Sequence, residues 1–270
     1  MVPLCGWWEP EGVQTPSGGR SPQPPTNRSG ADGPDGPGGL PRWGLGDAAA
    51  GIVVAQFLSI IAIGVVYSAT GWSAPGDVPI WATGLLQIPL WVGFAGAVWY
   101  AAERKGNGLV ADFGFSFRAL DAPVGLLVGV ACQVVVLPLL YWPVLHLLGR
   151  STDELSEPAE RLAGTADGNA GWFVLAVMVV VAAPLVEELF YRGLLLRSMT
   201  KRGWAPWVAV PGSAALFAAM HFQPLQFLGL FVFGSVLGVL AHLYGRLGPA
   251  IWAHVGFNAT TVVALYTAAN

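Results

Sequence analysis

Seven long apolar runs constrain the fold of this chain more than any other feature. They lie at about residues 47–70, 78–102, 122–148, 172–198, 204–222, 225–245 and 249–268. Each is about long enough to cross the hydrocarbon core of a bilayer as a helix, which takes about 20 residues. The chain is 54% hydrophobic and only 11% charged, whereas a soluble domain carries about 25% charged residues. We therefore expect an all-α, polytopic transmembrane helical bundle over residues 47–270.

The first 46 residues have a different composition. Pro, Gly and Ser dominate them and large apolar residues are sparse, so they cannot bury enough surface to offset the entropy of ordering. We expect a disordered cytoplasmic tail. The two cysteines, Cys5 and Cys132, suggest neither a disulfide framework nor a metal pair. The formal net charge is -3 and there is no basic run, so nothing favours nucleic acid as a partner.

The cationic residues predict the orientation of the spans. The loops 71–77 and 222–224 contain no Lys or Arg. The loop 149–171 has Arg150 and Arg161 against five acidic residues. Most other basic side chains fall in the tail and in alternate loops, at Arg20, Arg28, Arg42, Arg104, Lys105, Arg118, Arg197, Lys201, Arg202 and Arg246. Because cytoplasmic loops are rich in Lys and Arg, we expect a cytoplasmic N-terminus, seven spans and an external C-terminus. A chain without organelle signals fits a bacterial plasma membrane.

Ionisable residues inside the spans indicate where chemistry occurs. A charged side chain at mid-bilayer costs about 2.5–3.5 kcal/mol on insertion scales. Asp47 and Arg197 lie at the ends of their spans. Setting these two aside, the first three spans hold only His146. The last four hold Glu187, Glu188, Arg192, His221, His242 and His254. Any catalytic or transport site is therefore predicted in the C-terminal half.

The adjacent acids Glu187 and Glu188 have different expected roles. At about 100° per residue, Glu188 and Arg192 lie about 40° apart on one helix face, which is a favourable ion-pair spacing. Glu187 lies about 140° from Arg192, so it stays available as an acid, a base or a metal ligand. The alternative is a helix-pairing salt bridge in which one glutamate is protonated.

Polar residues on two later spans complete a candidate site. His254 and Asn258 are four residues apart and share a helix face, and His221 follows Phe217 by one turn. For a single histidine, such as His146 or His242, an interior structural role is the usual interpretation. One Glu with two His is a known ligand set for catalytic zinc. The same residues can act without a metal if Glu activates water and the His and Asn side chains stabilise the oxyanion.

A shared site requires His221 to lie at the depth of Glu187. A straight helix from Trp204 would place His221 about 26 Å from the inner face, against about 16 Å for Glu187. We therefore predict that the helix breaks near Pro211 and Gly212, so that the true span begins there.

Three motifs in this order resemble a known family. "EELFYR" matches E-E-x-x-x-R, "FAAMH" matches F-x-x-x-H and "HVGFN" matches H-x-x-x-N. The set is similar to the CPBP family of intramembrane metalloproteases, the CAAX protease and bacteriocin-processing or ABI family, which includes type II CAAX prenyl endopeptidases. The resemblance covers about residues 170–265. Members of this family often have more than seven spans, so an eighth is an alternative to the count made here.

The resemblance implies specific roles. Glu187 would activate water, and Glu188 and Arg192 would complete its motif. His221 would orient the water, while His254 and Asn258 would stabilise the tetrahedral intermediate. Glu187, His221 and His254 would be the ligands if zinc is bound, and a metal-free mechanism stays open.

The leading interpretation is an intramembrane endopeptidase, an integral membrane hydrolase acting in CAAX-box processing or intramembrane proteolysis. Its partners would be the bilayer and a prenylated or membrane-embedded peptide or protein. One alternative is a non-catalytic immunity or membrane binding protein. Another is a proton-coupled transporter with Glu187 and Glu188 as its proton site, although no internal repeat supports it.

Overall fold

Helices make up the regular structure of residues 41–270, the part of the chain that the computed structural model describes, and no strand occurs there. The predicted all-α class is thereby confirmed. Most of the predicted tail, with Cys5, lies outside the described residues.

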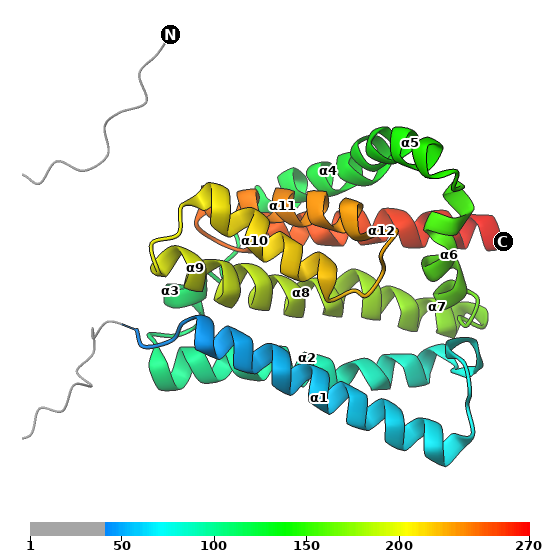
Figure 1. Ribbon diagram of the computed structural model, residues 1–270, viewed down its shortest axis with the longest axis horizontal. Coiled ribbons are helices and arrows are strands. Elements are labelled where there is room, and N and C mark those ends of the chain that lie inside the picture. Colours follow the sequence, from blue (N-terminus) through cyan, green and yellow to red (C-terminus); the bar gives the residue numbers. More distant parts are fainter. Residues whose placement is uncertain (1–40) are drawn as a thin grey trace, which may run out of the picture. The chain divides into compact units, whose positions relative to one another are not determined.

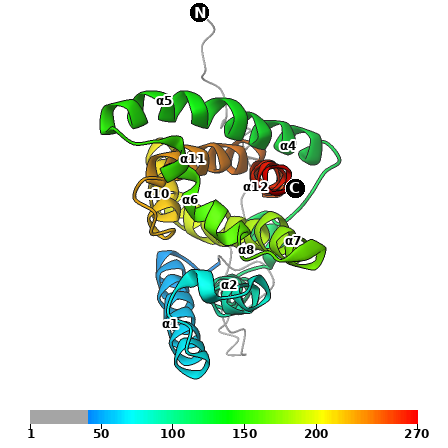
Figure 2. The ribbon, with the colours of Figure 1, turned by 90° about the vertical axis from the view of Figure 1, so that its right-hand side faces the viewer.

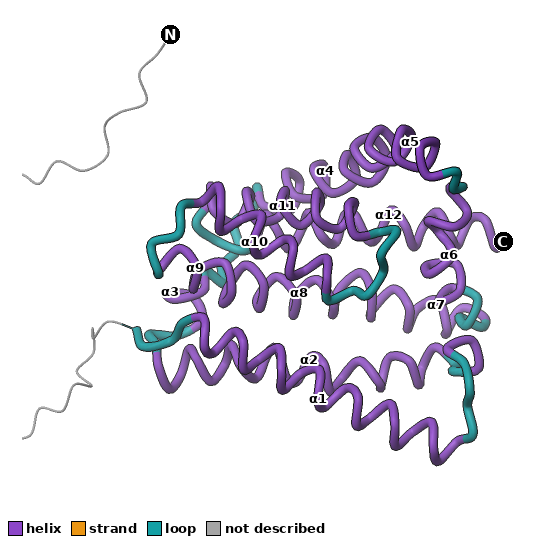
Figure 3. The backbone as a smooth tube through the Cα atoms, viewed as in Figure 1, coloured by secondary structure: helices purple, strands orange, loops and turns teal. Residues whose placement is uncertain are grey.

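All seven predicted apolar runs are helical, and their ends agree with the prediction within a few residues (Figure 3). In chain order the elements are α1 (Leu45–Thr70), η1 (Pro75–Asp77), α2 (Ile80–Lys105), α3 (Leu109–Phe113), α4 (Asp121–Ala131), η2 (Cys132–Val136), α5 (Leu137–Leu148), α6 (Thr152–Ala163), α7 (Gly168–Ala176), η3 (Val177–Ala182), α8 (Ala183–Glu187), η4 (Glu188–Leu196), α9 (Arg197–Lys201), α10 (Pro206–Ala219), α11 (Phe227–Tyr244) and α12 (Gly248–Ala269). The segments η2, η3 and η4 are π-helical and join their neighbours into longer continuous helices.

Five of these continuous helices, rather than seven, are long and apolar enough to cross a membrane. They are Leu45–Thr70, Ile80–Lys105, Asp121–Leu148, Gly168–Lys201 and Phe227–Tyr244. The 14 residues of α10 reach only about 21 Å, which is shorter than the hydrocarbon core. The His, Asn and Thr residues of α12 lower its hydropathy below that of the five. The protein is an integral membrane protein.

The helix Gly168–Lys201 lies between two groups of helices (Figures 1 and 2). On one side are α1 and α2, which pack against α8 and η4. On the other side are α10, α11 and α12, and the helix formed by α4 and α5 lies beyond them. Residues of the central helix are therefore covered by neighbours from both halves of the chain.

Hydrogen bonds join several helix ends that carry basic residues. The Arg42 N–H donates to the Lys105 carbonyl at 2.6 Å, which joins the start of the described chain to the end of α2. Lys201 Nζ, at the end of α9, donates to the Trp43 carbonyl at 2.7 Å. Arg197 donates to the Gly245 carbonyl, 2.7 Å away, at the end of α11. The charge pattern assigned these helix ends to one side of the membrane. The hydrogen bonds hold them together at one end of the bundle.

A helix that the sequence analysis did not predict lies in the segment expected to be a loop between residues 149 and 171. This helix, α6, begins with a capping box, in which Ser151 accepts from the Glu154 N–H and the Glu154 side chain accepts from the Ser151 N–H. The S-x-x-E spacing is a recognised start signal and could have revealed the helix. Its polar composition separates it from the spans.

The close crossing of α1 and α2 depends on one glycine. A Cβ at Gly93 would lie 2.3 Å from the Ala55 Cα and 2.6 Å from its Cβ. Gly96, one turn later on α2, has no described atom within 4 Å of the same position. The two glycines therefore form a matched pair in which only Gly93 is needed for packing.

We predict that Gly93→Ala lowers the thermal unfolding midpoint in detergent by several degrees, because overpacking a close contact costs about 1–3 kcal/mol. Gly96→Ala should leave the midpoint unchanged or raise it slightly, since Ala is the better helix former. Differential scanning fluorimetry of the two variants checks this, and an equal response of both would contradict the crossing.

Candidate active site

The acid pair sits at a junction between two helix geometries. Glu187 ends α8, and Glu188 begins the π-helical segment η4. Wide π turns are rare in α-helices, but those that do occur often lie at functional sites. The angles expected from the sequence hold for a uniform α-helix, and the π segments η3 and η4 of this helix were not predicted.

Glu188 and Arg192 form an ion pair with no exposed side-chain surface. Arg192 Nη1 donates to Glu188 Oε1 at 2.7 Å, so the predicted pairing is confirmed. Nη2 of the same arginine donates to the Gly234 carbonyl at 2.9 Å, and its guanidinium lies 4.6 Å from the centre of the Phe217 ring. A charge buried in this way needs several partners, and α10 and α11 supply two of them.

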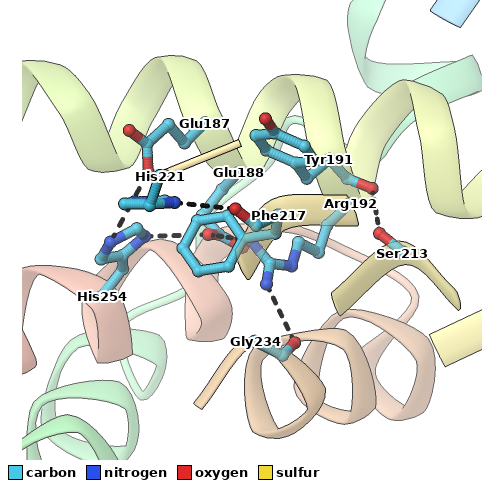
Figure 4. A network of polar contacts seen from close by, with 9 residues as sticks. All are labelled: Glu187, Glu188, Tyr191, Arg192, Ser213, Phe217, His221, Gly234 and His254. Carbon is cyan, nitrogen blue, oxygen red and sulfur yellow. Dashed lines mark hydrogen bonds and ion pairs between the residues drawn. The ribbon is translucent and has the colours of Figure 1, made fainter. Parts of the chain in front are cut away.

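His254 is held between the two acids (Figure 4). Its Nδ1 lies 2.9 Å from Glu188 Oε1, and its Nε2 lies 3.8 Å from Glu187 Oε2. Because Glu188 is ionised beside Arg192, it can only accept, so Nδ1 carries a hydrogen and donates. The bond fixes the ring and directs Nε2 toward Glu187.

Glu187 differs from its neighbour in exposure and bonding. Its side chain is 17% exposed, against 0% for Glu188. Its separation of 3.8 Å from His254 is longer than a hydrogen bond. The carboxylate therefore keeps capacity to accept a proton or bind another group.

His221 lies just past the end of α10, close to the same region. Its Nδ1 is 2.7 Å from the Phe217 carbonyl, and since a carbonyl accepts, Nε2 is the nitrogen left for other partners. The Phe217 ring packs against His221 at 4.6 Å and His254 at 5.9 Å between ring centres. Figure 4 shows Glu187, His221 and His254 projecting toward the same region.

The predicted break near Pro211 and Gly212 is wrong. The helix α10 is continuous from Pro206 to Ala219, with Pro211 inside it. No break is needed, because the helix that carries Glu187 continues to Lys201, further than the predicted end at residue 198. At about 1.5 Å per residue, Glu187 then lies about 21 Å from the end of its own helix. Ala219 lies about 20 Å from the start of α10, so His221 reaches a comparable depth without a break.

Asn258 points to a different part of the acid-bearing helix. Its Nδ2 donates to the Val179 carbonyl at 2.8 Å, in η3, two turns before the acid pair. His254 and Asn258 thus both bond to the helix 168–201, but to separate positions on it. Of the other two histidines, His146 has its ring parallel to that of Trp142. His242 lines a cavity of about 200 Å³ together with Arg197, Thr200 and Arg192, the partner of Glu188.

Three parts of the site had little or no signal in the sequence. Gly234 contributes only a carbonyl, and a Cβ there would lie 3.1 Å from Arg192 Nη2. The Val179 carbonyl likewise has no side-chain signature. Phe217 is the one of the three that the sequence indicates, as the first residue of the F-x-x-x-H motif that ends at His221, although its contact with Arg192 was not predicted.

The three residues expected to bind zinc are not arranged as a metal site. Within residues 41–270 no group of three or more His, Cys, Asp or Glu side chains is arranged to hold a metal ion. His254 directs one nitrogen to Glu188 and the other to Glu187. Glu187, His221 and His254 therefore do not form a ready three-ligand set in this arrangement. The zinc assignment stays a prediction.

Fold and site define a class: a polytopic helical membrane protein with a Glu–His cluster inside its bundle. Residues 169–260 match the family model described as Rce1-like, type II CAAX prenyl endopeptidase Rce1-like. The resemblance inferred from the three motifs is confirmed over these residues, about a third of the 270-residue chain. The match supports a CAAX-type intramembrane protease. No curated protein and no solved structure matches the chain significantly.

The two acids are predicted to respond differently to neutralisation. Glu188→Gln should lower the free energy of unfolding by about 3–5 kcal/mol, because it leaves the Arg192 charge buried without a counter-charge. Glu187→Gln should change stability much less, since this side chain is partly exposed and forms no Lys or Arg ion pair within the described residues. Thermal unfolding of both variants in the same detergent measures the difference, and similar losses would show that the two acids are not distinct.

Proposed function

We propose that the chain is an intramembrane endopeptidase that hydrolyses a peptide bond of a prenylated, CAAX-type or membrane-embedded substrate by glutamate-activated water. The observation that carries this proposal is the asymmetry of the acid pair. Glu188 is fully buried and one of its oxygens is bound by both Arg192 and His254, whereas Glu187 keeps a partly exposed carboxylate beside Nε2 of His254. One acid is structural, and the other is available for proton transfer.

The reaction would begin at Glu187. Its carboxylate takes a proton from water, and the water oxygen attacks the carbonyl carbon of the scissile bond. The tetrahedral intermediate then collapses, the C–N bond breaks, and Glu187 passes the proton to the leaving nitrogen. General acid–base catalysis of this kind contributes about 10²–10⁴-fold.

The two histidines would support different steps. His221 Nε2, without a hydrogen in the neutral ring, can accept from the attacking water and so orient it. When His254 is protonated, its Nε2–H can donate to the developing oxyanion, and Glu188 holds the ring in place as a carboxylate does in a hydrolase triad. If zinc is bound, Glu187, His221 and His254 are the residues expected to hold it, and the ion would supply Lewis-acid polarisation.

We infer that the site is reached from the cytoplasmic side. The ends at Lys105, Lys201 and Gly245 lie together and are flanked by the basic residues of the chain, which favours a cytoplasmic location. A lipidated C-terminus displayed on the inner leaflet would meet this end of the bundle.

The test is cleavage of a prenylated reporter peptide by purified protein in liposomes. Glu187→Gln should reduce kcat by at least about 100-fold while the protein stays folded, because the proton acceptor is lost. His254→Ala should cause a similar loss. His146→Ala is the matched control and should retain activity, since His146 stacks on Trp142 away from the site.

Unchanged cleavage by both Glu187→Gln and His254→Ala would contradict the proposal and leave a binding or transport role. A chelator titration of the active wild type then decides between the two mechanisms. Loss of activity that zinc restores indicates a metal, whereas activity insensitive to chelation indicates water activation by Glu187 alone.

A further inference from the structure

One backbone carbonyl near the site lacks its normal partner because of a proline. In η3 the Ala183 N–H donates to the Met178 carbonyl, a bond between residues five apart. The next bond of this pattern would run from residue 184 to the Val179 carbonyl. Position 184 is proline, which has no N–H, so that bond cannot form.

The side chain of Asn258 takes the place of the missing donor. Its Nδ2 lies 2.8 Å from the Val179 oxygen, and it reaches this atom from α12. In a bilayer no water is available to satisfy a free carbonyl, and proline is tolerated in a membrane helix where a neighbouring group supplies the bond. The amide of Asn258 fits this need in both position and chemistry.

The geometry of η3 determines where the acid pair points. A π turn contains more residues than an α turn, so a change of η3 to α geometry would rotate everything after it by about one residue, or about 100°. Glu187, the last residue of α8, follows Ala182 by only five residues. The direction of both acids therefore depends on η3 keeping its form.

We propose that Asn258 is a positioning residue that stabilises the π segment η3 by replacing the N–H that Pro184 lacks. It acts through the shape of the acid-bearing helix and not by contact with the tetrahedral intermediate, the role that the family resemblance implies. The effect on cleavage rests on the proposed function, but the effect on folding does not.

The test is a double-mutant cycle between Asn258→Leu and Pro184→Ala. Leu has a similar shape to Asn but no donor, whereas Pro184→Ala restores an N–H to the helix. Wild type, both single variants and the double variant are compared for thermal midpoint in detergent and for kcat and KM in liposomes. Thr260→Val is the matched control, because it removes a side-chain bond made within α12 itself, to the Gly256 carbonyl.

In the wild-type background, which keeps Pro184, Asn258→Leu should lower the midpoint by roughly 3–8 °C, the scale expected for an unsatisfied buried carbonyl. It should also reduce kcat by about 10-fold or more with little change in KM, since small displacements of catalytic groups are costly. In the Pro184→Ala background, Asn258→Leu should lower the midpoint by less than half as much as in the wild-type background. The reduction in kcat should be correspondingly smaller.

Two results would overturn the inference. One is an equal loss of midpoint in both backgrounds. The other is a loss of kcat by Asn258→Leu without any loss of midpoint, which is expected if the amide contacts the reacting atoms. If the wild type cleaves no reporter, or if Pro184→Ala alone abolishes cleavage, the midpoints still decide the role of Asn258, because they need no activity.

Discussion

The buried ion pair of Glu188 and Arg192 is the interaction on which the rest of the C-terminal half depends. Two charges removed from water are costly unless several hydrogen bonds compensate them, and inside a bilayer the requirement is stricter. Here the compensation comes from His254, from the Gly234 carbonyl and from the Phe217 ring. These partners lie on α10, α11 and α12, so the contacts of one ion pair join three helices to the central one.

The same pair explains how two neighbouring glutamates acquire different roles. Glu188 is fully buried and spends one oxygen on both Arg192 and His254. That bond also sets the hydrogen of the His254 ring and turns its other nitrogen toward Glu187. Glu188, the structural acid, thus orients His254, which faces Glu187, the proposed catalytic acid. Chemistry and stability are coupled through His254.

The sequence predicts the helices well and the polar network only in part. Apolar runs locate the helices because their length and composition are set by the bilayer, and the i, i+4 spacing is enough to pair Glu188 with Arg192. The π segments escape prediction because local sequence patterns do not show contacts between distant residues, such as the bond from Asn258 to the Val179 carbonyl in η3. The sequence predicts a helix break near Pro211 because proline often ends a helix, yet α10 accommodates it. Main-chain acceptors such as Gly234 leave no pattern at all.

The most direct test of the central claim, that Glu187 activates water and does not attack the substrate itself, is a single turnover in water enriched in ¹⁸O. Mass spectrometry of the product and of the peptide that contains Glu187 locates the label. The account predicts one ¹⁸O atom in the new carboxylate of the product and none in the Glu187 side chain. Label in the Glu187 carboxylate would reveal a covalent acyl-enzyme intermediate and would contradict the account.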